Sequence, residues 1–178
     1  KDLNHASLSD PRVHVVNDDA FTYVRDSNAA YDVVLIDLVD PSNEKLAKLY
    51  STEFYRHVEA RLAPEGVMVT QATSTFFSPH AFSTVASTVA AAQPDRQILP
   101  FSTNVPSFGE WGFVLSTRTP QNLISQPLPE GLTYQDRKTL EFIMRTKPAR
   151  TETMEPSTLL HPRIVEVYNR DMRQWRYY

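Results

Sequence analysis

The sequence predicts an α/β fold: a partial, Rossmann-like sheet flanked by helices, with an antiparallel strand pair at its end and a helical C-terminal appendage. Two apolar runs, Tyr31–Asp37 and Val67–Thr73, have the length and composition of strands buried on both faces of a parallel sheet. A segment of helical periodicity separates them, which is typical of a β-α-β unit. A cluster of prolines after Thr119 then marks a change in organisation.

The sequence pattern predicts four further segments in the first half of the chain. Arg12–Val16 is rich in β-branched residues and is expected to form a short strand. Asp19–Arg25 is expected to be a helix that starts on an acidic turn. Asp40–Leu49 is polar and is predicted to be a loop, and Thr52–Leu62 follows as a helix with apolar residues on one face.

The next segments complete the sheet. Ala63–Gly66 has the composition of a turn that leads into the second buried strand. Ser78 followed by Pro79 predicts the start of a helix that runs to about Ala92, because serine caps helices and proline suits the first helical position. Arg96–Phe101 and Trp111–Thr117 are the candidates for the terminal antiparallel pair.

The composition after Thr119 predicts a division into two parts. Residues 1–119 would form the main α/β unit, and residues 120–178 a linker and a helical extension packed on it. The linker contains Pro120, Pro127 and Pro129 and ends at Gly131. Two segments of the extension are expected to be helical, Tyr134–Arg145 and Pro162–Trp175.

Composition excludes several functional classes. The formal net charge of −3 argues against a nucleic-acid partner, which would require a basic face. The absence of cysteine excludes disulfides and thiolate chemistry, and the five histidines show no metal-ligand spacing, so no metal is expected. No apolar run approaches the ~18 residues that cross a bilayer.

The first apolar run ends in two acidic residues. Asp37 and Asp40 follow it directly, and Pro41 prevents a helix from starting at Asp40. In open α/β sheets, ligands bind at the carboxyl ends of the strands, so both carboxylates are candidate site residues. From this pattern alone, Asp37 could instead cap a turn and Asp40 could simply be solvated.

Five blocks of the sequence resemble the polyamine aminopropyltransferase (spermidine synthase) family in order and spacing. They are Arg12–Phe21, Asp37–Pro41, Leu49–Tyr55, Gln71 and Val105–Phe113. The last block is most similar to bacterial spermidine-synthase-like proteins that carry a membrane-spanning N-terminal region. The resemblance implies a class I methyltransferase-like fold and aminopropyl transfer from decarboxylated S-adenosylmethionine to putrescine or a related amine.

The resemblance also implies roles on the acceptor side. Asp37 takes the catalytic position and would hold and deprotonate the attacking nitrogen. Asp40 matches the second acid that contacts the substrate amines, while a turn-stabilising role beside Pro41 stays open. Tyr50 and Gln71 would line the pocket of the polyamine. Core packing is an equal alternative for Tyr50, whereas Gln71 is harder to explain as core because a buried amide needs partners.

On the donor side the resemblance is partial. Asp19 and Ala20 match the pair whose aspartate contacts the donor's adenine, and Asp18 could share that role or cap the helix. The donor would be a co-substrate rather than a permanently bound cofactor. The four glycines are unclustered, so the family's glycine-rich donor turn is missing. We therefore expect the C-terminal, acceptor-side half of a longer protein, which lacks its N-terminal part and is inactive alone.

The hypothesis of an acceptor-side half predicts what partners the chain has and where it is located. Arg12–Val16 would lack a neighbouring strand, which makes a homo-oligomer possible. The chain would be cytoplasmic, with any membrane anchor of the parent upstream.

Val105 stands where many spermidine synthases have a tyrosine, which leaves the acceptor's identity open. Phe76, Phe77 and Phe108 would either be core residues or reshape the pocket. Alternative functions are an S-adenosylmethionine-dependent methyltransferase-like enzyme and a non-catalytic polyamine- or partner-binding domain.

Overall fold

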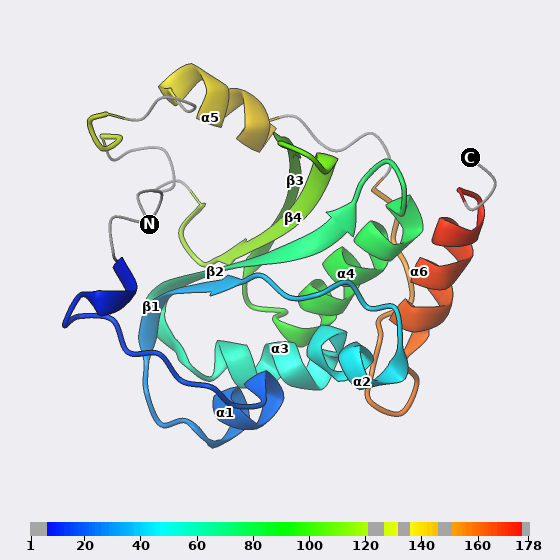
Figure 1. Cartoon of the computed structure of the whole chain (residues 1–178), viewed down its shortest axis with the longest axis horizontal. Coiled ribbons are helices and arrows are strands. Elements are labelled where there is room, and N and C mark those ends of the chain that lie inside the picture. The colour runs from blue at the N-terminus through cyan, green and yellow to red at the C-terminus, as the bar shows by residue number, and fades with distance from the viewer. Residues whose placement is uncertain (1–6, 121–126, 132–135, 146–150, 176–178) are drawn as a thin grey trace.

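The computed structural model describes residues 7–120, 127–131, 136–145 and 151–175. Within them a four-stranded sheet runs through the centre of the molecule (Figure 1). Its strands follow the spatial order β1-β2-β4-β3, with β1 and β2 parallel and both β4 pairings antiparallel. The strand bounds are β1 (Tyr31–Ile36), β2 (Leu62–Ser74), β3 (Gln97–Val105) and β4 (Gly109–Thr117).

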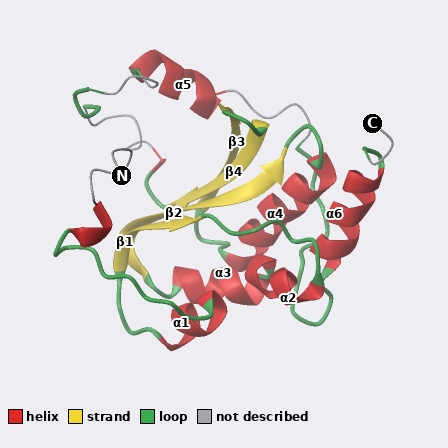
Figure 2. Cartoon of the chain, in the orientation of Figure 1, coloured by secondary structure: helices red, strands yellow, loops and turns green. Residues whose placement is uncertain are grey.

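Six α-helices accompany the sheet in the described residues (Figure 2). Three of them, α1, α3 and α4, cover one face of the sheet, and α6 packs on the outside of α4. The bounds are α1 (Ala20–Asp26), α2 (Glu44–Ala47), α3 (Thr52–Glu59), α4 (Pro79–Ala92), α5 (Arg137–Arg145) and α6 (Arg163–Arg173), with short 3₁₀ turns η1 (Ser7–Ser9) and η2 (Lys48–Tyr50).

The core lies between the sheet and these helices. Tyr55, Met68, Phe82 and Val89 are fully buried there, and each such side chain contributes about 1.5–3 kcal/mol. Gly112 of β4 permits the close contact with α4, because a Cβ at this position would lie 2.4 Å from the Phe82 ring. The apolar periodicity of α3 and α4 therefore reflects burial against the sheet.

The opposite face of the sheet is exposed near β1. Val33 and Leu35 are 60% and 76% exposed, although they lie in the middle of an apolar strand. β1 pairs only with β2 among the described strands, so its other edge carries free backbone groups. The sequence predicted a strand buried on both faces, and this chain buries only one of them.

Two predicted elements of the first half are wrong. Arg12–Val16 lies outside the strands and has no strand partner among the described residues. Its β-branched residues cannot form a strand on propensity alone, since strand structure requires pairing. Asp40–Leu49 is not a plain loop either, because it contains α2 and part of η2; Asn43 caps α2 by accepting a hydrogen bond from the Leu46 amide at 3.2 Å.

The other helix and strand predictions are confirmed with shifted ends. The expected turn Ala63–Gly66 is wrong, because these residues lie inside β2, where the pairing with β1 is irregular between Tyr31 and Val33. The helices α1, α3, α4 and α6 and the antiparallel β3–β4 pair are present. The expected helix Tyr134–Arg145 begins at Arg137 in α5, and positions 134 and 135 lie outside the described residues, as do positions 121–126 of the predicted linker.

The C-terminal part is joined to α4 by an extended strap, residues 151–158. Backbone amides of the strap donate to a row of hydroxyls on α4: Glu152 to Ser83 at 3.1 Å, Met154 to Ser87 at 2.9 Å and Ser157 to Thr88 at 2.9 Å. Ser83 and Ser87 stand about one helical turn apart, which matches the two-residue step from Glu152 to Met154 in an extended chain, and Thr88 follows Ser87 directly. This contact fixes where α6 begins.

Candidate functional site

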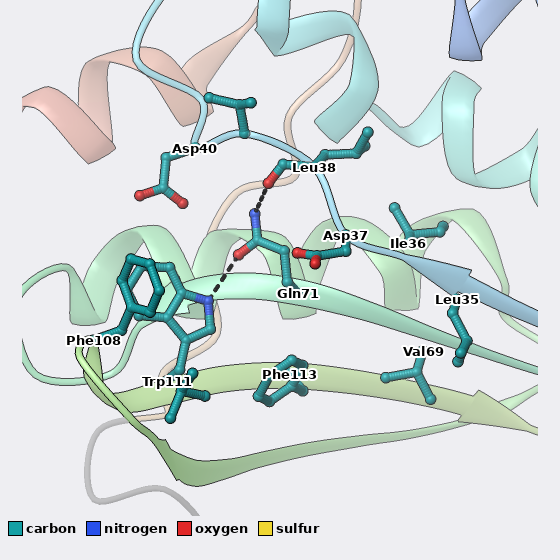
Figure 3. A pocket seen from close by; sticks show the side chains of 12 residues that line it. Leu35, Ile36, Asp37, Leu38, Asp40, Val69, Gln71, Phe108, Trp111 and Phe113 are labelled. Carbon is teal, nitrogen blue, oxygen red and sulfur yellow. Dashed lines mark hydrogen bonds between the residues drawn. The ribbon is translucent and has the colours of Figure 1, made fainter. Parts of the chain in front are cut away.

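A cavity of about 590 Å³ opens at the carboxyl ends of β1 and β2 (Figure 3). The loop after β1 forms one wall, and the β3–β4 hairpin forms the opposite wall. Its polar lining comes from Asp37, Asp40 and Gln71. The surrounding lining is mainly apolar and includes Leu35, Val69, Val105, Phe108, Trp111 and Phe113.

The two acidic residues occupy different environments. Asp37 follows the last residue of β1 directly and is exposed to the cavity. Asp40 is half-buried, and its Oδ2 accepts a hydrogen bond from the Tyr168 hydroxyl of α6 at 2.9 Å. Burial raises the pKa of Asp40, and the hydrogen bond from Tyr168 opposes that rise. The structure therefore brings together the two carboxylates that the sequence singled out.

Gln71 connects the two walls of the cavity. Its Nε2 donates to the Leu38 carbonyl at 2.7 Å and to the Tyr50 hydroxyl at 2.5 Å. Its Oε1 accepts from the Thr73 amide at 2.8 Å and from Trp111 Nε1 at 3.1 Å. Figure 3 shows the bonds of Gln71 to Leu38 and to Trp111. All hydrogen-bonding positions of the amide are thus used, and the side chain is 3% exposed. Gln71 fixes the loop after β1 relative to β4.

Tyr50 lies behind the cavity rather than on its surface. It is 1% exposed, and its hydroxyl donates to the Val39 carbonyl at 3.0 Å. Burial raises the pKa of this hydroxyl far above its usual range, so it remains a protonated donor. The residue therefore supports the loop that carries Asp40, and a contact of Tyr50 with a ligand stays a prediction.

The end of β2 holds an unusual backbone conformation. Thr73 has φ +68°, in the left-handed region that β-branched residues rarely adopt. The pairing with β4 is irregular between Gln71 and Ser74, as expected at a β-bulge. The Gln71 side chain accepts from the Thr73 amide and stabilises this conformation. Such local strain often occurs at functional sites, and here it adjoins the cavity.

The aromatic lining was only partly predicted. Trp111 and Phe108 pack edge to face with ring centroids 5.4 Å apart and line the cavity. The sequence places Trp111 in a block that resembles the family, but no local pattern there predicts that its side chain lines the cavity. Phe76 and Phe77 are not core: they are 58% and 39% exposed and pack with Trp175.

The predicted donor residues lie apart from this cavity, at the N-terminus of α1. Asp19 caps the helix by accepting from the Thr22 amide at 3.0 Å, and it pairs with Lys48 Nζ at 2.5 Å. Both contacts lower the pKa of Asp19. Asp18 accepts from the Asp19 amide at 2.7 Å and is not the cap, while Ala20 is the first residue of the helix.

Within the described ranges, no group of three or more acidic or histidine side chains is placed to hold a metal ion. None of the helices that the structure describes is long and apolar enough to span a membrane.

The sequence profile of the spermine/spermidine synthase domain matches residues 2–126. The chain belongs to this family. Polyamine aminopropyltransferase 1 of Streptomyces coelicolor is 41% identical over 180 residues, covering 99% of this chain and 33% of that protein. The polyamine aminopropyltransferase of Mycobacterium tuberculosis is also 41% identical, over 97% of this chain and 33% of its own length.

Solved structures confirm the expected fold. A spermidine synthase in complex with the transition-state analogue AdoDATO superposes with a TM-score of 0.64 at 21% identity, covering 78% of this chain and 50% of that one. Spermidine synthase from Thermotoga maritima gives a TM-score of 0.59 at 19% identity, over 78% and 48% of the two chains. The chain spans about a third of the length of the curated relatives it matches.

Proposed function

We propose that this chain supplies the acceptor side of a polyamine aminopropyltransferase, which transfers an aminopropyl group from decarboxylated S-adenosylmethionine to putrescine or a related amine. The observation that carries the proposal is the placement of Asp37 and Asp40 at the carboxyl end of β1, in one largely apolar cavity. Two carboxylates in such surroundings suit a ligand with two ammonium groups separated by methylenes. Membership of the family supports the reaction type.

The proposed reaction is a displacement at carbon. The amine nitrogen attacks the methylene next to the sulfonium, the new C–N bond forms, and the C–S bond breaks with its electron pair passing to sulfur. The products are the aminopropylated amine and the neutral thioether 5′-methylthioadenosine. The leaving group already carries the positive charge, so the chain's own task is to orient and deprotonate the nucleophile.

Protonation is a large part of the barrier. An aliphatic amine with a pKa of ~10.4 is only ~10⁻³ free base at pH 7, a cost of about 4–5 kcal/mol. Asp37 is the proposed general base, because it lies at the strand end, exposed to the cavity, where it can take the proton as the C–N bond forms. Asp40 is proposed to bind the distal ammonium, and Gln71 to keep the loop between them fixed.

We further propose that the donor site is completed by a part of the protein beyond these residues. The exposed side chains of Val33 and Leu35 and the unpaired edge of β1 support this proposal, since a complete α/β sheet would cover them. A neighbouring segment or a second copy could supply the cover. Asp18, Asp19 and Ala20 would then contact the donor's adenine at the start of α1.

The test is Asp37→Asn in the full-length protein, with aminopropyl transfer measured by the appearance of 5′-methylthioadenosine. We expect kcat to fall by about 10²- to 10⁴-fold, the range of a lost general base. Asp32→Asn is the matched control, because Asp32 lies on the same strand, is exposed and does not line the cavity. Normal turnover of Asp37→Asn would overturn the catalytic assignment, and product analysis that shows methyl transfer would replace the reaction type.

A further inference from the structure

The second carboxylate of the cavity is held by a helix outside the matched family region. Tyr168 belongs to α6, while the family profile ends at position 126. Its hydroxyl donates to Asp40 Oδ2 at 2.9 Å across 128 positions of sequence. Burial and the neighbouring Asp40 raise the pKa of Tyr168 far above its usual value, so the phenol remains a donor at every working pH.

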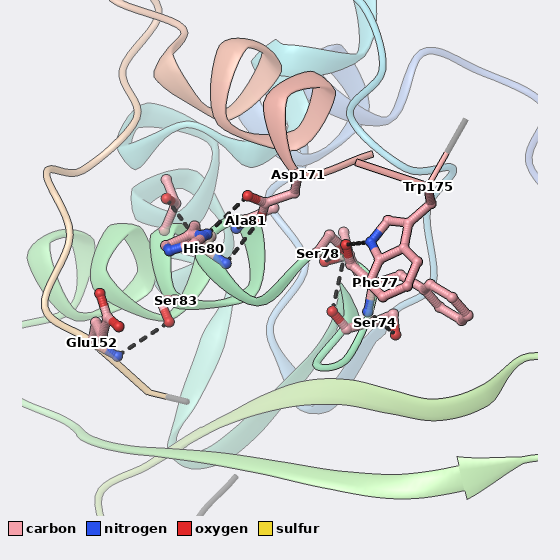
Figure 4. A network of polar contacts seen from close by, with 11 residues as sticks. Ser74, Phe77, Ser78, His80, Ala81, Ser83, Glu152, Asp171 and Trp175 are labelled. Atoms are coloured by element: carbon pink, nitrogen blue, oxygen red, sulfur yellow. Dashed lines mark hydrogen bonds and ion pairs between the residues drawn. The ribbon is translucent and has the colours of Figure 1, made fainter. Parts of the chain in front are cut away.

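The position of α6 is fixed at several points, so this contact is not incidental. Asp171, one turn after Tyr168, is 1% exposed and accepts from the His80 and Ala81 amides at 2.9 and 3.1 Å (Figure 4). His80 Nδ1 lies 2.8 Å from the other oxygen of the same carboxylate. One further turn on, Trp175 Nε1 donates to the Phe77 carbonyl at 2.9 Å.

A second contact joins the same helix to the loop that carries Asp40. Asn169 Nδ2 donates to the Ser42 carbonyl at 3.1 Å. Tyr168 and Asp171 follow the i, i+3 spacing of one helical face, which is directed at the loop and at the start of α4, and Trp175 lies just past the C-cap Gln174. The strap and the buried Asp171 thus fix the position of α6 along its axis and its rotation about that axis. As a consequence, Tyr168 reaches Asp40.

We propose that Tyr168 is a positioning residue of the acceptor site, which holds the Asp40 carboxylate in the orientation that receives the distal ammonium of the amine. This inference rests on the proposed function. The hydroxyl occupies one oxygen of Asp40 and leaves the other for the ligand. It also favours the charged form of a half-buried carboxylate that desolvation disfavours. The C-terminal extension therefore acts in amine recognition rather than only in stability.

The test compares Tyr168→Phe with Asn169→Ala in the full-length protein. Both changes remove one contact between α6 and the loop, but only the first touches Asp40. Calorimetric affinity for putrescine and spermidine is measured from pH 5 to 9, together with kcat and KM. For Tyr168→Phe we expect affinity to fall about tenfold, as for the loss of a hydrogen bond to a charged group, with KM rising more than kcat falls.

The pH dependence separates positioning from a general loss of structure. Without the hydrogen bond from the Tyr168 hydroxyl, the pKa of Asp40 rises further. The acid limb of the pH profile of amine affinity should therefore move to higher pH in Tyr168→Phe. Asn169→Ala should leave that limb in place. Amine binding that Tyr168→Phe leaves unchanged, or an equal shift in both variants, would overturn the inference alone. Absence of amine binding by the unaltered protein would overturn the proposed function and this inference with it.

Discussion

Gln71 shows how a single side chain can determine the geometry of the cavity. Its amide connects the Leu38 carbonyl on one wall to Trp111 on the other and stabilises the strained Thr73. Replacement by leucine, Gln71→Leu, keeps the volume but leaves these buried groups without a partner. Each unsatisfied group costs about 1–3 kcal/mol, so we expect unfolding free energy to fall by about 3 kcal/mol in urea titrations.

The matched control for Gln71→Leu is Gln97→Leu. Gln97 lies on β3 and is exposed, so the same change there should alter stability by less than about 0.5 kcal/mol. A small effect of Gln71→Leu would mean that water or a rearranged loop satisfies the freed groups. In that case the cavity walls are not held together by the Gln71 amide.

At the scale of elements, α4 depends on α6 for its N-terminal cap. Ser78 stands at the N-cap, as the sequence predicts, but its side chain makes no capping bond; its hydroxyl donates to Thr73 and Ser74 instead. The buried carboxylate of Asp171 accepts from the first amides of the helix in its place. A negative charge at this end also interacts favourably with the helix dipole.

Asp171→Ala should therefore destabilise the protein by about 2–3 kcal/mol, since it leaves buried amides unpaired and detaches α6. Asp136→Ala is the matched control, because Asp136 caps α5 through the Thr139 amide at 2.7 Å but is exposed. There the loss should stay near 1 kcal/mol, as for an ordinary cap. Chemical denaturation measures both, and equal losses would show that α6 contributes nothing beyond a simple cap.

These elements also show what the sequence could and could not predict. Asp37 and Asp40 were predictable because their position follows from a local pattern, an apolar strand that ends in acids. The contact of Tyr168 with Asp40 was not, since no local pattern links positions 128 residues apart. Arg12–Val16 was predicted wrongly for a related reason: a strand exists only with a paired neighbour, and propensity does not supply one.

At the scale of the whole molecule, carboxylates with opposite pKa shifts give the stability its pH dependence. Burial raises the pKa of Asp40. The favourable contribution of this residue to the free energy of unfolding is therefore present below the unfolded pKa of 3.8 and is lost as pH rises through the folded pKa. Lys48 lowers the pKa of Asp19, so that contribution is present above 3.8 and is lost as pH falls through the lowered value.

Charge removal at the two positions should therefore have opposite effects. At pH 7, Asp40→Asn should raise the melting temperature, because a half-buried charge is removed while Asn can still accept from Tyr168. Asp19→Asn should lower it, because the pair with Lys48 is lost while the helix keeps an effective cap. The Asp40→Asn difference should shrink as the pH falls through the raised pKa of Asp40. The Asp19→Asn difference should shrink only below pH 3.8, as the pH falls through the lowered pKa of Asp19. If Asp40→Asn is less stable than the unaltered protein at pH 7, the Asp40 carboxylate is well stabilised in its site. A charged Asp40 that is ready to bind an incoming ammonium would then not lower the free energy of unfolding.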